Sequence, residues 1–418
     1  MNGFDIAAIL IAIAALAGYV NHRVLRLPNT SGTLIIAMAS SLVIVLADLA
    51  SPSWHLRDVV GRFLADVDFN ATLMRGMLCF LLFAGALRVD LVYLLRNKWT
   101  VGSLSTIGVL ISTVLIGMLS WWVFKLFGVP APLLICMVFG ALISPTDPIA
   151  VMGLLKELGA SKDLDAKIGG ESLFNDGIGV VVFFALASLL DASGAPAAHG
   201  AMDVSGLVVF FLREVIGGSA LGLLCGYLGY RALKTVDDHS LDLLMTLALV
   251  MGMYALSFQI HVSGPIAVVV AGIFIGNPAR QGETPAKTAV HLHAFWDLLD
   301  EILNAVLFLL IGLQVFAVTI PLRVSLVALI AIPIALLARF VSVGVPITVM
   351  RLFIKPARGL VTILTWSGLR GGLSVAMVLS LPPFPERELL LASTYAIVVF
   401  SILVQGLTMR RVLLRYQN

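Results

Sequence analysis

The sequence predicts an all-α polytopic membrane protein, and three observations carry that prediction. Of its 418 residues, 60% are hydrophobic and only 12% are charged, whereas a soluble domain is about 45–50% apolar and about 25% charged. Apolar runs recur along the whole chain, from Phe4 to Leu414. Most charged residues lie in the short segments between those runs. A water-soluble globule, a soluble enzyme and a disordered chain are therefore excluded.

Thirteen apolar runs are predicted to be membrane-spanning helices, because each approaches the ~20 residues that a helix needs to cross the hydrocarbon core. Each run ends at a polar or Pro/Gly-rich segment of the kind that interrupts helices. The predicted spans, numbered 1 to 13 in chain order, cover roughly residues 4–20, 32–50, 70–87, 99–127, 131–155, 166–190, 204–233, 240–258, 262–276, 294–317, 320–350, 358–381 and 388–409.

Lysine and arginine are distributed unevenly over the segments between these spans. With the N-terminus placed outside, the predicted cytoplasmic loops and tail carry 18 of the 27 basic residues, and the outer loops carry five. Basic residues favour the cytoplasmic side of a membrane. The sequence therefore predicts a multi-pass protein of the plasma membrane, such as a bacterial inner membrane, with its N-terminus outside and its C-terminus in the cytoplasm.

The spans divide into two six-span units of opposite topology, spans 1–6 and spans 8–13, with span 7 (residues 204–233) as a linker. Spans 5 and 12, which occupy the same place in each unit, both contain helix-breaking residues. These are Ser144-Pro145-Thr146-Asp147-Pro148 and Gly368-Leu369-Arg370-Gly371-Gly372. Interrupted helices at matching places of inverted repeats are typical of transporter binding sites. Ordinary helix kinks are the simpler alternative, but the charge at each break favours a site.

Two carboxylates fall deep in neighbouring spans. At ~1.5 Å per helical residue, Asp147 of span 5 lies ~12 Å and Asp176 of span 6 lies ~15 Å from the inner surface. Two carboxylates that share a low-dielectric site cannot both ionise cheaply, so a proton and a bare monovalent cation compete to relieve their repulsion. The hydroxyls of Thr146 and Ser172, with carbonyls freed by a broken span 5, complete a predicted oxygen shell for Na⁺, Li⁺ or K⁺.

The other deep charges are predicted to support the structure. An ionisable group inside the bilayer is costly, and a guanidinium at depth requires a carboxylate or several carbonyls. We expect Glu171 of span 6, which shares a helix face with Asn175, to pair with Arg339 of span 11. Arg370 of span 12 is expected to hold helices together rather than to contact the ion.

Three acids, Asp297, Asp300 and Glu301, lie near the cytoplasmic start of span 10. A solvated helix N-terminus is the favoured interpretation, because its dipole stabilises negative charge. A funnel that attracts cations is the alternative. The histidines lie in or near the predicted loops, which argues against a zinc site beside the two deep acids.

A set of short motifs extends from span 3 to span 12. The most specific are Ser-Pro-Thr-Asp-Pro-Ile-Ala-Val at 144–151 and Gly-Glu-Ser-Leu-Phe-Asn-Asp-Gly at 170–177. Others are Phe-Ala-Gly-Ala-Leu at 83–87, Ser-Gly-Pro-Ile-Ala-Val-Val-Val-Ala-Gly at 263–272, Phe-Leu-Leu-Ile-Gly at 308–312, the Ala-Arg339 span, and Trp-Ser-Gly-Leu-Arg-Gly-Gly at 366–372. With them the chain resembles the monovalent cation:proton antiporter family, of the bacterial NhaP and animal sodium/hydrogen exchanger type.

The resemblance implies a thirteen-span homodimer with crossed, unwound spans 5 and 12. Its dimerisation or scaffold domain would comprise about residues 1–90 and 238–318, and its ion-translocating core about residues 99–190 and 320–413. The resemblance further implies that Asp147, Thr146, Ser172 and Asp176 bind the ion, and that the supporting residues are Asn175, Glu171, Arg339, Arg370, Pro145 and Pro148.

The resemblance also implies electroneutral one-for-one exchange, because this family pairs that property with an Asn-Asp sequence like Asn175-Asp176. The chain departs from many members at Ala84, where they carry an acid in span 3. That departure puts in doubt any pH-regulating or ion-coordinating role for this position.

Two functions from other classes remain as alternatives. An intramembrane aspartyl protease also places two aspartates on neighbouring helices, but its Gly-x-Gly-Asp block is missing. A passive cation channel would use rings of carbonyls or acids around an oligomeric pore. Strict dependence of proton flux on a counter-cation separates exchange from leak. No cofactor and no nucleic-acid partner are expected.

Overall fold

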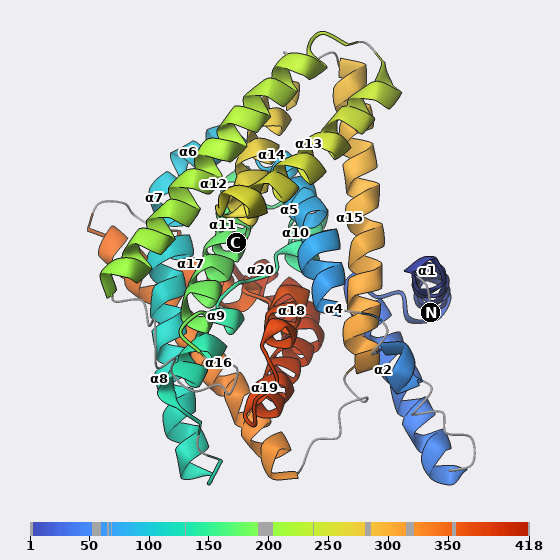
Figure 1. Ribbon diagram of the computed structural model, residues 1–418, viewed down its shortest axis with the longest axis vertical. Helices are drawn as coiled ribbons and strands as arrows, with labels where there is room; N and C mark the ends of the chain where they lie inside the picture. The colour runs from blue at the N-terminus through green and yellow to red at the C-terminus, as the bar shows by residue number, and fades with distance from the viewer. Residues whose placement is uncertain are drawn as a thin grey trace.

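The computed structural model describes residues 3–51, 60–64, 67, 69–129, 131–190, 204–236, 238–280, 286–314, 322–352 and 357–416. Regular structure within these ranges is almost entirely helical, and an isolated β-bridge joins Asp147 and Leu369. Eight of the described helices are long and apolar enough to cross a membrane. The helices, which Figure 1 shows tilted against one another, fall into two groups by their mutual contacts.

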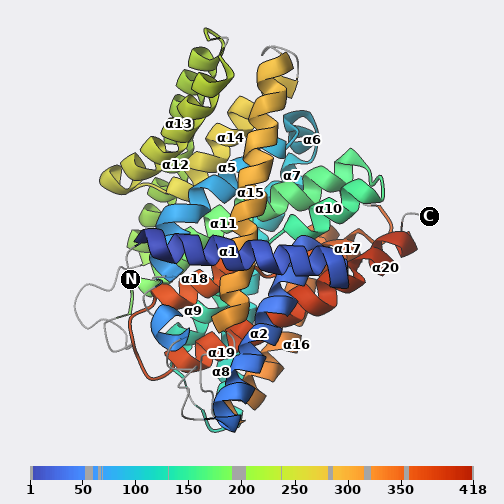
Figure 2. The same ribbon diagram turned by 90° about the vertical axis from the view of Figure 1, so that its right-hand side faces the viewer.

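The first group contains the N-terminal helices and those of the middle of the chain. In it α2 packs on α15, and α5 packs on both α14 and α15, while α1 lies across α2 and α15 (Figure 2). Its helices are α1 (Gly3–Val20), α2 (Asn29–Ala50), α4 (Phe69–Ala71), α5 (Leu78–Arg88), α12 (Val204–Leu233), α13 (His239–Ile260), α14 (Gly264–Arg280) and α15 (Ala286–Gln314).

The second group contains the remaining helices. In it α8 packs on α9 and α16, α9 packs on α11, and α16 packs on α19. Its helices are α6 (Leu91–Arg96), α7 (Lys98–Ser103), α8 (Val109–Leu126), α9 (Leu133–Ile143), α10 (Ile149–Glu157), α11 (Lys162–Ala187), α16 (Leu322–Met350), α17 (Leu360–Ser367), α18 (Gly372–Ser380), α19 (Arg387–Phe400) and α20 (Leu407–Tyr416).

Glycines permit the closest helix contacts, as is usual between membrane helices. A Cβ at Gly140 of α9 would clash with the backbone carbonyl of Thr113 in α8. A Cβ at Gly312 of α15 would lie 2.5 Å from the Cβ of Ala37 in α2. These two helix pairs therefore pack with their backbones in close approach at these glycines.

Several boundaries differ from the prediction. The helix expected from residue 294 begins at Ala286, and a short helix, α6, lies in a segment expected to be a loop. Single π-helical turns interrupt three of the predicted spans, at Thr72–Met77, Leu104–Gly108 and Ser401–Gly406. Apolar periodicity does not distinguish these turns from α-helix, since both bury the same kinds of residue.

The earlier start of α15 corrects the interpretation of its acids. Asp300 lies in the middle of the 29-residue helix rather than at a solvated N-terminus. It is only 6% exposed. Asp297 and Glu301 on the same helix are exposed, as expected.

Candidate functional site

The two interrupted helices meet at their breaks. One helix stops at Ile143 and resumes at Ile149, and the other stops at Ser367 and resumes at Gly372. The backbone N–H of Asp147 donates to the carbonyl of Leu369 across 2.8 Å, which joins the two extended segments. Proline lacks a backbone donor and glycine weakens helices, so both interruptions follow from the local sequence. The breaks predicted in spans 5 and 12 are therefore present, and they cross.

A polar network ties the first break to α11. The hydroxyls of Thr146 and Ser172 lie 3.0 Å apart. Asn175 makes two contacts with Thr146: its Nδ2 donates to the threonine Oγ1 at 2.7 Å, and its Oδ1 accepts from the threonine N–H at 3.1 Å. All three residues are buried. Asn175 thus replaces a helical hydrogen-bond partner that the break removes from Thr146.

The two predicted carboxylates lie beside this network. Asp176 follows Ser172 by one helical turn of α11, and its carboxylate interacts electrostatically with those of Asp147 and Glu171 and with the guanidinium of Arg370. Asp147 and Asp176 are both partly exposed, whereas Thr146, Ser172 and Asn175 are buried. The carboxylates are therefore the accessible part of the site.

Close approach of the second break shapes the surroundings of Asp147. Its Oδ1 accepts from the N–H of Ile149 at 2.9 Å, at the start of α10. On the side of Oδ2, a Cβ at Gly371 would clash with the carboxylate. Glycine at this position therefore leaves the space that the Asp147 carboxylate occupies.

Arg370 supplies a fixed positive charge at the crossing. Its Nη1 donates to the carbonyls of Ser144 and, at 2.7 Å, of Pro145. Its backbone N–H donates to Oγ of Ser401 at 2.9 Å. A guanidinium at depth requires a carboxylate or several carbonyls, and Arg370 uses the carbonyls that the first break leaves without helical partners. The second break therefore stabilises the first.

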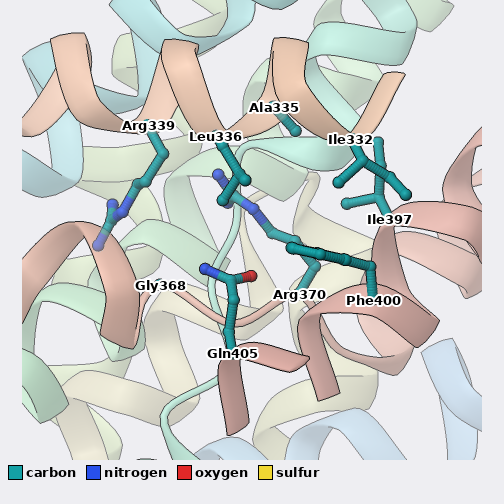
Figure 3. Close-up of a pocket in the computed structure, with 9 residues that line it drawn as sticks. All are labelled: Ile332, Ala335, Leu336, Arg339, Gly368, Arg370, Ile397, Phe400 and Gln405. Carbon is teal, nitrogen blue, oxygen red and sulfur yellow. The ribbon is translucent and has the colours of Figure 1, made fainter. Parts of the chain in front are cut away.

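The ion pair predicted between Glu171 and Arg339 is present. It is bidentate, with Nη1–Oε1 and Nη2–Oε2 separations of 2.6 and 2.8 Å, and the arginine is 6% exposed. Nη2 also donates to the carbonyl of Leu364 at 2.9 Å, in α17. Figure 3 shows Arg339 on α16, with Gly368 and Arg370 of the second break on the facing segment. Glu171 and Arg339 thus join α11, α16 and α17.

The crossing also uses residues that sequence reasoning missed. Ser144 and Leu369 each contribute a backbone carbonyl to it, and Ser401 contributes a hydroxyl. None carries a charge, and serine and leucine are common in membrane helices, so no signal in a single sequence distinguishes them. Ala84 is buried in α5 and brings no side-chain oxygen.

The donor set fits a small hard cation better than a transition metal. Carboxylate, hydroxyl and carbonyl oxygens surround the crossing, and hard monovalent and divalent cations prefer such ligands. Among the described residues no group of three or more His, Cys, Asp or Glu side chains is arranged to hold a metal ion. His291 and His293, expected near a loop, lie within α15.

Comparisons with a family model and with individual proteins point to the same family. Residues 11–415 match the family model "Sodium/hydrogen exchanger, transmembrane". The Na⁺/H⁺ antiporter NhaP of Pseudomonas aeruginosa is 44% identical over 411 residues, covering 97% of this chain and 95% of that protein. The Na⁺/H⁺ antiporter NhaH of Halobacillus aidingensis is 34% identical and covers 82% of this chain and 83% of its own.

Solved structures of an archaeal antiporter have a similar fold. The sodium proton antiporter MjNhaP1 from Methanocaldococcus jannaschii at pH 8 superposes with a TM-score of 0.74 at 18% identity. The superposition covers 98% of this chain and 97% of the archaeal one.

Proposed function

The chain belongs to the sodium/hydrogen exchanger family, and from this premise we propose that it exchanges one monovalent cation for one proton across a membrane. It is a multi-pass membrane protein and a secondary transporter rather than an enzyme. In the proposal, Na⁺ is the foremost substrate, with Li⁺ and K⁺ as the others that the oxygen ligands admit. Asp147 and Asp176 bind the ion, assisted by Thr146 and Ser172.

The observation that carries the proposal is the pair of partly exposed carboxylates at the crossing of two broken helices. Because Asp147 and Asp176 repel each other, the site is stable only when a cation or a proton occupies it. The two substrates therefore compete for one place. A carrier whose site changes sides only with a cation or a proton bound, and never empty, exchanges one substrate for the other.

Charge balance at the crossing supports electroneutral exchange. Glu171 and Arg339 neutralise each other. The fixed charge of Arg370 offsets one of the two carboxylates, which leaves a single negative charge for the substrate to neutralise. One Na⁺ and one H⁺ then carry the same charge, so a one-for-one exchange cycle moves no net charge across the membrane.

We further propose thirteen spans in two inverted repeats. Helices α2 and α15 correspond to spans 2 and 10, and they are in contact, as are α5 and α14, which correspond to spans 3 and 9. In the proposed repeats span 2 is equivalent to span 9 and span 3 to span 10. Each of the two contacts is therefore the counterpart of the other. The same equivalence relates the two broken helices. Broken helices fail a length criterion for a continuous span, which accounts for spans 5 and 12 lying outside the eight that satisfy it.

The packing supports the proposed domains. Spans 1–3 and 8–10 form a scaffold, spans 4–6 and 11–13 form the ion-translocating core, and α12 links them, as its contacts with α14 and α11 suggest. Movement of the core against the scaffold would expose the site alternately to each side. A homodimer in the plasma membrane, with the N-terminus outside and the C-terminus inside, completes the proposal.

Cation-dependent proton flux in proteoliposomes tests this function. Adding Na⁺, Li⁺ or K⁺ should dissipate an imposed pH gradient. When the membrane potential is clamped, no electrical current should accompany this proton flux. Asp176→Asn should remove the flux while leaving thermal unfolding unchanged within about 1 kcal/mol. Normal flux in that variant would contradict the assigned site, and flux without any counter-cation would indicate a channel.

A further inference from the structure

A hydrogen bond from a buried tyrosine joins the proposed core to the proposed scaffold. Tyr395 of α19 is 4% exposed, and its hydroxyl donates to Oε1 of Gln314, the last residue of α15. Helix α19 packs within the group that contains the crossing, whereas α15 packs mainly on helices of the other group. The bond therefore exists only while these parts of the two groups lie together.

Both residues lie in the outer half of the membrane in the proposed topology. Gln314 is near the end of span 10, which runs outward, and Tyr395 follows the start of span 13, which runs inward. At ~1.5 Å per helical residue, Gln314 lies ~5 Å and Tyr395 lies ~10 Å from the outer ends of these spans. The bond thus ties the core to the scaffold on the outer side of the crossing.

The second broken helix packs differently on the two sides of its break. Its outer half, α18, contacts the scaffold at α4, at the π-helical turn Thr72–Met77 and at α15. Its inner half, α17, has its main contacts in the core, with α16, α20 and the π-helical turn Ser401–Gly406. The inner half of the first broken helix, α10, likewise packs mainly on α11 and on that second turn. The scaffold therefore holds the broken helices chiefly on the outer side.

Burial along the first broken helix has the same asymmetry. Residues 138–146, on the outer side of Asp147, are all buried, whereas Asp147, Pro148 and Ile149 are partly exposed. Exposure therefore begins at the carboxylate and continues into α10, toward the proposed cytoplasmic side. Packing and burial both indicate a state in which the site is closed to the outside.

Opening of the outer side requires the bond to break. If the core moves against the scaffold, Tyr395 and Gln314 separate, and the tyrosine hydroxyl loses its acceptor. A buried donor without a partner is costly, so the bond favours the state with the outer side closed. A hydrogen bond of this kind changes the ratio of two states by about 2- to 10-fold.

We propose that Tyr395 and Gln314 form an outer latch, which closes the site to the outside and favours the state that is open to the cytoplasm. The latch breaks when the loaded core moves to expose the site outside, and it forms again when the core returns. The latch rests on the proposed function, because it acts on the alternating exposure of Asp147 and Asp176.

Apparent KM values for Na⁺ at the two membrane faces test the latch. Na⁺-dependent proton flux would be measured in everted vesicles, which present the cytoplasmic face, and in right-side-out vesicles, both from cells without other Na⁺/H⁺ antiporters. Tyr395→Phe removes only the hydroxyl. The KM should fall about 2- to 10-fold at the outer face and rise at the cytoplasmic face, because apparent affinity follows the fraction of protein that faces each side.

A bond that only stabilises the fold predicts a different result. The two KM values would then stay the same or change in the same direction, with loss of maximal rate and thermal stability, and this would overturn the latch. Tyr254→Phe is the matched control. This buried tyrosine donates to the carbonyl of Met74 at 2.6 Å within the scaffold, so the ratio of the two KM values should not change.

Gln314→Met keeps the test decisive if Tyr395→Phe does not fold. It removes the acceptor with little change in volume, so the ratio of the two KM values should shift in the same direction. In the double variant the shift should not exceed the larger single shift, because either change breaks the bond. A double shift equal to the sum of the two would contradict the latch. Absence of cation-dependent flux in the unsubstituted protein would instead refute the proposed function itself.

Discussion

The two interrupted helices cross at one point, but they are built from different residues. The first break carries an acid, Asp147, between two prolines. The second carries a base, Arg370, among three glycines. Proline interrupts a helix by removing a donor, whereas glycine also lets another backbone or side chain approach closely.

This difference indicates a division of labour. The first break presents a carboxylate that is partly exposed, while the second places its guanidinium, which is 3% exposed, on the carbonyls of the first. One break therefore presents an accessible carboxylate, and the other holds the crossing together. Two equivalent positions in the proposed repeats have acquired opposite charges and different tasks.

The largest effect is expected from filling the space at the second break. In Gly371→Ala the new Cβ would clash with the Asp147 carboxylate and displace it. We expect cation-dependent flux to fall by about 100-fold or more, as for small displacements of reacting groups. Cation-dependent proton flux measured in proteoliposomes tests this expectation.

Gly153→Ala in α10 is the control for that substitution. Its Cβ would meet no atom within 4 Å, and alanine favours a helix by up to ~1 kcal/mol over glycine. Flux should stay normal there. Normal flux in Gly371→Ala as well would show that the second break does not confine Asp147.

A smaller effect, on stability, is expected at the ion pair behind the second break. Glu171→Gln leaves the buried guanidinium of Arg339 without a counter-charge, which costs about 3–5 kcal/mol when such a pair is broken. Thermal unfolding in detergent would show the loss. A fully stable but inactive Glu171→Gln protein would contradict the structural role.

An exposed pair of the same type serves as the control. Glu157 of α10 lies 3.5 Å from Arg410, and both side chains are at least 60% exposed. Exposed pairs contribute about 0–1 kcal/mol, so Glu157→Gln should unfold at nearly the same temperature as the unsubstituted protein.

The smallest effect is expected from a single hydroxyl of the first break. Ser172→Ala removes the contact with Thr146 and one proposed ligand, which should raise the apparent KM for Na⁺ by about 3- to 10-fold. Ser103→Ala removes a hydroxyl that donates to the Thr100 carbonyl and contacts Met350 of α16, outside the proposed site, and should leave the KM unchanged. A larger loss at Ser103 than at Ser172 would refute the proposed network.

Much of the site was predictable from the sequence because buried charge is rare in a membrane protein. Asp147, Glu171, Asp176, Arg339 and Arg370 stand out against apolar neighbours, and insertion costs require a partner for each. The pairing of Glu171 with Arg339 followed from that requirement.

The rest depended on features without a sequence signal. Ser401 and Leu369 contribute backbone or hydroxyl groups that only the crossing brings close. Asp300 was misassigned because α15 begins eight residues earlier than its apolar run indicates. Hydropathy follows the lipid-facing length of a helix, whereas this helix extends beyond that length and is stabilised by its neighbours.

Proton release on cation binding tests the central claim most directly. Na⁺ would be titrated into the purified, weakly buffered protein at two pH values while the released protons are counted. Competition at Asp147/Asp176 predicts about one proton released per Na⁺ bound under conditions that leave the site protonated, and weaker Na⁺ binding at the lower pH. Asp176→Asn should release none. Na⁺ binding that releases no protons and does not change with pH would contradict the account.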